Sequence, residues 1–117
     1  SSMETRILRD PSSFSTIETL ANEQFGDFVK AVVDVELKLM AVGGELHSDQ
    51  EALLLEAGSK QESLWGINLY PAKPKDEWIE FDSMINVRPS QDNRSRGVGN
   101  PEIRARIAEV VCGLIPR

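Results

Sequence analysis

Apolar residues recur at every second position in several segments of this chain, which is the pattern of a β-strand with one buried face. Strands are expected at residues 5–8, 28–37, 39–42, 64–70 and 78–87. The second and third segments follow each other so closely that they predict a hairpin, turning near Leu37 and Lys38. A loop with two prolines separates the last two segments, and we expect these two strands to pair antiparallel.

Three other segments carry apolar residues at helical spacing, and helices are expected at residues 16–25, 48–57 and 100–114. Sequences typical of a capping box open the first two helices, with Ser15 and Ser48 as the N-cap residues. Asn100, followed by a proline, is typical of the N-cap of the third helix. The buried stripe of this last helix is predicted to comprise Ile103, Ile107, Val110, Val111 and Leu114.

The element order is therefore β-α-β-β-α-β-β-α. Predicted hairpins outnumber crossover connections, which favours an α+β fold. We expect a mostly antiparallel or mixed sheet of about five strands, with three helices packed on one of its faces. A length of 117 residues corresponds to one domain. This single domain is expected to span residues 3–117, because Ser1 and Ser2 before Met3 are typical of a cloning remnant.

The composition excludes several classes of protein. Hydrophobic residues make up 40% of the chain and charged residues 27%, which excludes a disordered chain. No apolar run approaches the ~20 residues that cross a bilayer, and no secretion signal opens the chain, so we expect a cytoplasmic protein without a membrane partner. The single cysteine, Cys112, excludes an intrachain disulfide, and the single histidine, His47, excludes multi-histidine metal centres. No nucleotide- or phosphate-binding motif is present, and no cofactor is expected.

The charged residues are distributed unevenly. A net charge of −6 argues against a nucleic-acid partner, because neutralising phosphates needs a basic surface. Residues 1–60 carry 5 basic and 11 acidic side chains, whereas residues 61–117 carry 8 of each. Residues 86–106 contain five arginines and only two acidic side chains. The planar guanidinium group suits carboxylates and phosphates, so this segment predicts either a small anionic partner or ion pairs with the acidic N-terminal half of the chain itself.

Binding of an anionic or phosphate-bearing small ligand is accordingly our leading hypothesis. Alternation along the strand expected at residues 78–87 would place Asp82, Asn86 and the following Arg88 on one face. The irregular loop at residues 89–99 would bring further arginines towards the start of the last helix, where an anion is favoured. The predicted ligand-binding residues are Asn86, Arg88, Asn93, Arg94, Ser95 and Arg96. The alternative is a solvated strand face and a loop folded by its own hydrogen bonds.

Two further hypotheses involve the single histidine. An enzyme at the arginine-rich segment, a hydrolase or transferase acting on a phosphorylated substrate, would use Asp82 as general base or metal ligand, with His47 in support if the fold brings it near. A metal site would use Glu45, His47 and Asp49, which alternate along an extended segment. The competing interpretation of Asp49 is that it stabilises the first turn of a helix through the helix dipole.

The remaining candidates favour structural roles. Asp34 and Glu36 share one face of a predicted strand, and we expect them at its exposed edge rather than as an acid–base pair. Cys112 lies beside the apolar stripe of the last helix and is expected to be buried. Three large aromatic residues are expected mostly in the core or at a subunit interface: Trp65, Tyr70 and Trp78.

A homo-oligomeric protein-interaction module is the third class of function that the sequence allows. Hairpins leave strand edges that a second copy of the chain covers in an edge-to-edge dimer. The acidic half of one copy also complements the arginine-rich loop of another.

Two long segments, residues 58–71 and residues 81–97, resemble a family of small uncharacterised bacterial proteins that share a domain of unknown function. Their sequences are GSKQESLWGINLYP and FDSMINVRPSQDNRSRG. The likeness also takes in residues 25–36 and 43–47, so it covers nearly the whole chain. It implies a bacterial cytosolic origin and a single domain, and it implies no substrate or catalytic residue.

Overall fold

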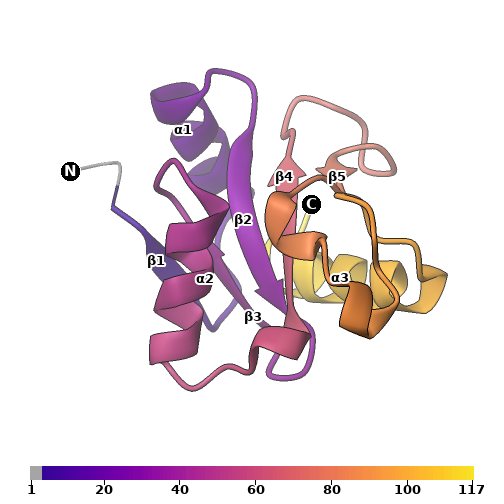
Figure 1. Ribbon diagram of the computed structural model, residues 1–117. Helices are drawn as coiled ribbons and strands as arrows, with labels where there is room; N and C mark the ends of the chain where they lie inside the picture. Colours follow the sequence, from indigo (N-terminus) through magenta and orange to yellow (C-terminus); the bar gives the residue numbers. More distant parts are fainter. Residues whose placement is uncertain (1–3) are drawn as a thin grey trace.

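The computed structural model describes residues 4–117 and contains a single five-stranded sheet in the order β1-β3-β2-β4-β5 (Figure 1). The strands are β1 (Arg6–Leu8), β2 (Val29–Asp34), β3 (Leu39–Val42), β4 (Leu64–Leu69) and β5 (Ile79–Glu80). All neighbouring strands run antiparallel, so the predicted α+β fold and element order are confirmed. The radius of gyration of 12.9 Å matches the value of about 13 Å expected for a compact chain of this length.

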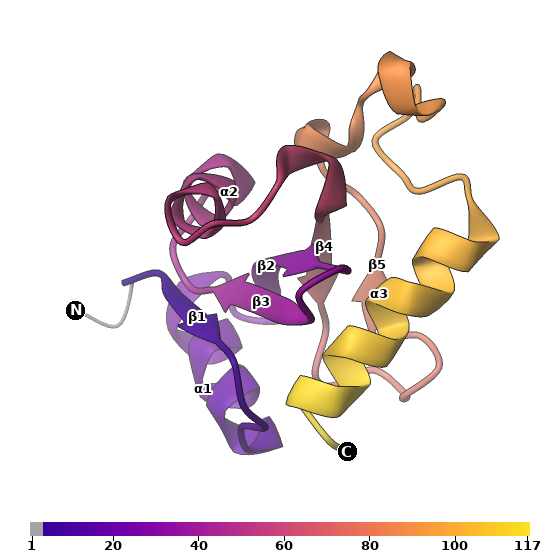
Figure 2. The ribbon, with the colours of Figure 1, turned by 90° about the horizontal axis from the view of Figure 1, so that it is seen from below.

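The three helices cover both faces of the sheet, which corrects the expectation that they share one face (Figure 2). They are α1 (Phe14–Gln24), α2 (His47–Glu56) and α3 (Pro101–Leu114). Helix α2 lies on one face, and α1 and α3 lie on the other. The reason is that the central strands carry buried residues on both faces, with Val32 on one side of β2 and Val33 on the other. None of the helices within residues 4–117 is long and apolar enough to cross a membrane.

The main core lies between the sheet, α1 and α3. It contains Trp65 and Trp78, both about 1% exposed, which confirms the expectation for these two side chains. The predicted stripe of α3 is also confirmed, since its four C-terminal members are buried and Ile103 packs against the core. Cys112 is exposed rather than buried, because it faces outward beside that stripe. A smaller cluster under α2 comprises Val32, Ala41, Leu54 and Leu64.

The first two helices each begin two residues earlier than their capping boxes predicted. Ser13 precedes α1 and Leu46 precedes α2, and neither side chain caps its helix. For α2 the reason is Gln50, whose side-chain amide donates to the carbonyls of Lys30 (2.8 Å) and Gly43 (2.6 Å) and fixes the start of the helix against β2. Asn100 is the N-cap of α3 as predicted, and its side chain accepts from the second and third residues that follow it.

Asp34 is fully buried, so the prediction that it lies at an exposed strand edge is wrong. One of its carboxylate oxygens accepts from the backbone N–H groups of Glu36 and Leu37, both at 2.9 Å. The other accepts from the hydroxyl of Ser59 at 2.6 Å. These bonds offset the cost of burying the carboxylate and close the hairpin at its predicted turn, where Lys38 adopts a positive φ. Glu36 is exposed, as expected.

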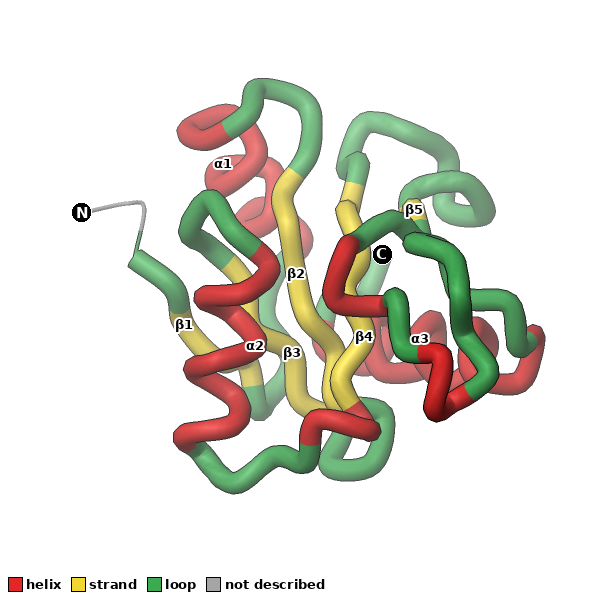
Figure 3. Tube along the Cα trace, viewed as in Figure 1, coloured by secondary structure: helices red, strands yellow, loops and turns green. Residues whose placement is uncertain are grey.

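The strand predicted at residues 78–87 ends after Glu80, and two 3₁₀ turns follow, at Met84–Asn86 and Pro89–Gln91 (Figure 3). The backbone leaves the sheet because Asn86 occupies the place of a pairing strand. Its side chain accepts from the N–H of Gly66 (2.8 Å) and donates to the Gly66 carbonyl (3.0 Å). A side chain at Gly66 would meet Ser83 at 2.5 Å, so only glycine fits beneath this segment.

The following stretch, residues 87–99, is held by a second buried asparagine. The side-chain amide of Asn93 donates to the carbonyls of Asn86 and Gly97 at 2.7 Å, and its oxygen accepts from the N–H of Gly99 at 3.0 Å. The backbones of Arg88 and Asn93 also exchange two hydrogen bonds. The loop is therefore folded by its own hydrogen bonds, as the alternative interpretation of this segment had it.

Replacing Asn86 with alanine is expected to lower the free energy of unfolding by at least about 2 kcal/mol, because buried backbone groups left without partners cost about 1–3 kcal/mol each. Urea denaturation measures the change. Asn22→Ala, at an exposed position on α1, is the control and should change stability by less than about 0.5 kcal/mol. Equal stabilities of the two variants would contradict the role given to Asn86.

Candidate functional site

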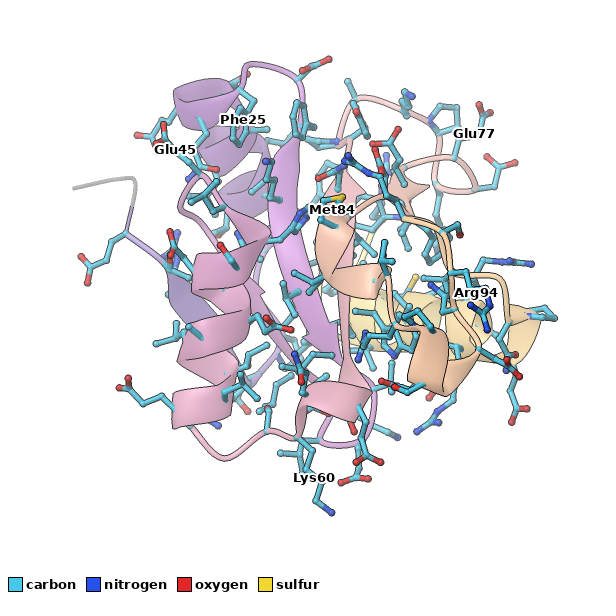
Figure 4. All side chains as sticks on the ribbon, viewed as in Figure 1. Phe25, Glu45, Lys60, Glu77, Met84 and Arg94 are labelled. Carbon is cyan, nitrogen blue, oxygen red and sulfur yellow. The ribbon has the colours of Figure 1, made fainter. Side chains whose placement is uncertain are left out.

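A cavity of about 200 Å³ opens between the start of α2, strand β2 and the residues 83–96 segment. Figure 4 labels Met84 at its border, between α2 and β5. The cavity is lined by Lys30, Leu46, His47, Ser48, Ser83, Met84, Ile85 and Arg96. The cavity thus brings the single histidine next to one of the predicted arginines, although they are far apart in the sequence.

His47 is held in one tautomer by a hydrogen bond within the fold. Its Nε2 lies 2.7 Å from the carbonyl oxygen of Ile67. Because a carbonyl only accepts, Nε2 carries the proton, and Nδ1 of the neutral ring keeps a free lone pair. Burial lowers the pKa of His47, the bond to Ile67 raises it, and the positive charge of Lys30 lowers it. The ring is therefore neutral at pH 7 and presents an acceptor.

Two cations and one carboxylate act on this ring. Arg96 donates from Nε to Asp82 at 2.7 Å, in an ion pair that is about half exposed. The charges of Lys30 and Arg96 lower the pKa of His47, and the charge of Asp82 raises it. An exposed pair of this kind contributes little to stability, but it holds the guanidinium group at the mouth of the cavity. Asp82 therefore serves as the partner of Arg96.

The N-terminus of α2 lies at the same cavity, because Leu46, His47 and Ser48 are among its lining residues. The N-cap position is Leu46, whose side chain has no acceptor, so no side chain satisfies the first N–H groups of the helix. The backbone N–H groups of Asp49 and Gln50 reach only the Leu46 carbonyl, at 3.2 and 3.4 Å. The positive end of the helix dipole therefore lies beside Lys30 in an opening that also contains Ser48.

An apolar rim surrounds these polar groups. Leu46 is 52% exposed and Met84 is 65% exposed, and both line the cavity. Lys30 also contacts an aromatic ring outside the cavity, since its Nζ lies 5.4 Å from the centre of the Phe25 ring. The Phe25 ring stacks on Phe28 at 4.7 Å. A ligand here meets charge inside the cavity and apolar surface at its edge.

Arg88, one of the predicted anion-binding residues, is used inside the fold. Its guanidinium group donates to the backbone carbonyls of Gln61 and Leu64 and lies 4.1 Å from the centre of the Trp65 ring. Burial lowers the pKa of Arg88. This side chain holds the 3₁₀ turns against β4 and is not directed at the cavity. Asn86 and Asn93 are likewise engaged by backbone groups.

Arg94 and Ser95 are exposed, and Figure 4 shows Arg94 on the side of its segment remote from α2. Two further arginines of the basic region bond to backbone carbonyls, Arg104 to Val98 at 2.6 Å and Arg106 to Val35 at 3.3 Å. Of the six predicted ligand-binding residues, only Arg96 lines the cavity. The expected strand face of Asp82, Asn86 and Arg88 does not form, because Asn86 lies in a 3₁₀ turn.

Glu45, His47 and Asp49 do not form the alternative metal site. The segment is not extended, since α2 begins at His47, and both carboxylates are exposed. Within residues 4–117 there is no group of three His, Cys, Asp or Glu side chains placed to hold a metal ion.

The sequence did not predict six of the cavity residues, which are Lys30, Leu46, Ser48, Ser83, Met84 and Ile85. Of these residues, Lys30 could have been found from the sequence, because it is the one cation on the polar face of the strand predicted at residues 28–37.

The free energy of unfolding is expected to rise as the pH rises through the ordinary histidine pKa of 6.5. The unfolded chain protonates His47 near its ordinary pKa of 6.5, whereas the folded chain protonates it only at lower pH, so protons favour the unfolded state. Urea titrations at several pH values measure this slope. In His47→Gln, whose amide retains a donor for Ile67, the slope should flatten; an unchanged slope would contradict this account of the ring.

Comparison with known proteins supplies a family and no function. The family model for a protein of unknown function, DUF5674, matches residues 6–114. No curated protein and no solved structure matches the chain. Since the match spans the whole sheet, all three helices and the cavity, the chain belongs to the DUF5674 family.

Proposed function

We propose that this protein binds a small organic anion, a carboxylate or a phosphate monoester, in the cavity between α2 and the residues 83–96 segment. The observation that carries the proposal is the convergence of Lys30, Arg96 and the uncapped start of α2 on one opening. Uncapped helix N-termini and cations both favour anions, and the carboxylate of Asp82 is already paired. This keeps the class of ligand expected from the sequence and moves its site from the arginine-rich loop.

The other groups of the cavity define the rest of the ligand. Nδ1 of His47 accepts a hydrogen bond, which favours a ligand with a hydroxyl or N–H donor beside its anionic group. Leu46 and Met84 favour an apolar portion at the mouth. The volume of about 200 Å³ lies below the usual range of about 300–1,000 Å³ for ligand pockets, so the ligand is small.

An enzyme at the same cavity is the second candidate, and the neutral ring of His47 favours it. A base with a free lone pair beside two cations suits removal of a proton from water during attack on a phosphate monoester. In this version His47, rather than Asp82, is the general base, because Asp82 is paired with Arg96. A homo-oligomeric module has less support, since the edge strands β1 and β5 contain only 3 and 2 residues. A bacterial origin and a cytoplasmic location stay part of the proposal.

Calorimetric titration with phenyl phosphate tests the proposal. Lys30→Met and Arg96→Gln should each weaken binding about tenfold or more, as expected for loss of a charge-assisted contact. Arg94→Gln is the matched control, because it removes an exposed arginine of the same segment, and its affinity should stay within about twofold of the wild type. Loss of binding in Arg94→Gln alone would show that the anion binds at the loop of residues 89–99 and not in the cavity. Absence of binding by the wild type would reject the proposal.

The same mixtures distinguish a binding protein from an enzyme. Hydrolysis of phenyl phosphate by water would release phenol and inorganic phosphate, and both are measured directly. Turnover that His47→Gln abolishes would establish the enzyme, whereas tight binding without product would establish the binding protein.

A further inference from the structure

The charges around the cavity at the start of α2 distinguish between the two kinds of anion proposed for it. Lys30 and Arg96 line the cavity, and Asp82 pairs with Arg96 at 2.7 Å. Because His47 is neutral, these side chains leave one net positive charge. Helix α2 adds its dipole, which Asp49 in the first turn partly offsets. One net charge balances a carboxylate, whereas a phosphate monoester carries a charge of about −1.5 to −2 at pH 7.

Arg96 keeps the part of its guanidinium group that fits a carboxylate. Asp82 takes the hydrogen bond of Nε, which leaves the two terminal amino groups for a ligand. Two parallel N–H donors on one planar group match the two oxygens of a carboxylate. Lys30 supplies a second cation to the same cavity from β2. These two side chains are therefore suited to hold one carboxylate between them.

His47 favours an uncharged hydrogen-bond donor next to that carboxylate. The ring lines the cavity, and its Nε2 bonds to the carbonyl of Ile67 at 2.7 Å, so Nδ1 is the ring nitrogen left to accept from a ligand. The α-ammonium group of a free amino acid would add a positive charge beside Lys30 and Arg96, which repel it. An amide N–H supplies the donor without this repulsion.

The mouth of the cavity favours an apolar group on the same molecule. Leu46 and Met84 line the cavity, and each is more than half exposed to solvent, so a ligand can cover them (Figure 4). Covering apolar surface of this kind removes it from water and favours binding. Ser48 is exposed at the same opening, and its hydroxyl is a donor for a carbonyl oxygen of the ligand.

We infer that the ligand is an N-acylated α-amino acid with an apolar side chain, either as a free small molecule or as the last residue of a peptide. The inference rests on the proposed anion site and narrows its ligand. Such a molecule carries all the required groups on one carbon atom. Its carboxylate meets Lys30 and Arg96, and its amide N–H donates to Nδ1 of His47. Its side chain covers Leu46 and Met84.

Calorimetric titration with N-acetyl-leucine and three close analogues tests the inference. Leucine, whose ammonium group is repelled, is expected to bind about tenfold more weakly or worse. The analogue 2-acetoxy-4-methylpentanoate has an ester oxygen in place of the N–H and should bind about three- to tenfold more weakly, as for one neutral hydrogen bond. The two enantiomers of N-acetyl-leucine should differ about tenfold, because three contacts fix the arrangement around one carbon atom.

An exposed side chain at the mouth allows a variant that leaves the core untouched. Met84→Ala should weaken binding of N-acetyl-leucine about threefold through lost apolar contact, and it should leave N-acetylglycine unchanged. Leu55→Ala is the matched control, because it removes an exposed apolar side chain of α2 outside the cavity, and it should change neither affinity.

A blocked peptide that ends in leucine distinguishes the two sources of the ligand. Tighter binding of this peptide than of N-acetyl-leucine would identify the end of a peptide chain. Equal binding would show that a single acylated amino acid is recognised.

Phenyl phosphate, titrated in parallel, separates the inference from the proposed function. If phenyl phosphate binds and Lys30→Met weakens it, while N-acetyl-leucine binds no more tightly than leucine or N-acetylglycine, the anion site stands and the inference is overturned. Equal affinities of the two enantiomers, or tighter binding of phenyl phosphate than of N-acetyl-leucine, would also overturn it. If the wild type binds none of these anions, the proposed function and the inference both fall.

Discussion

The hydrogen bonds between the side chain of Asn86 and the backbone of Gly66 determine how the second half of this structure is arranged. They let a side-chain amide take the place of a pairing strand beside β4. The chain after β5 therefore crosses the sheet on the α2 side instead of extending it. This position brings Arg96 opposite His47, so the cavity exists because the last strand is short. Asn93 and Arg88 then hold the segment in place through backbone carbonyls.

The sequence was sufficient to predict which segments form strands and that the fold is α+β, because these segments carry apolar residues in alternation and a short turn joins β2 to β3. It failed at residues 78–87, where Phe81 and Ile85 have the spacing of one strand face. In the structure Phe81 packs against the main core and Ile85 against the cluster under α2, on opposite faces of the sheet. Alternation alone does not distinguish one buried face from two separate contacts. The burial of Asp34 was missed for a related reason, since its partner Ser59 is distant in the sequence.

The sequence predicted the kind of ligand that the cavity suits, but it did not predict which residues line the cavity. Arginine, serine and a single histidine indicated an anion, but which arginine faces it depends on long-range contacts. Arg88 is taken up by carbonyls of the chain around β4, and Arg96 is free to reach Asp82 and the cavity. Lys30 enters because β2 lies between β3 and β4, directly beneath the start of α2. These relations follow from strand order, which no local pattern encodes.

The contact between Gly66 and the segment above it also constrains how the sequences of this family diverge. A residue with a side chain at position 66 would displace Ser83, and the amide of residue 86 would then lose both of its partners on β4. Selection at one position therefore depends on the residue at the other. Relatives that lack this glycine are expected to lack the asparagine as well, and in them the final strand is free to lengthen and the opening beside His47 to close. The presence of both Gly66 and Asn86 in a related sequence therefore predicts that the cavity is present there as well.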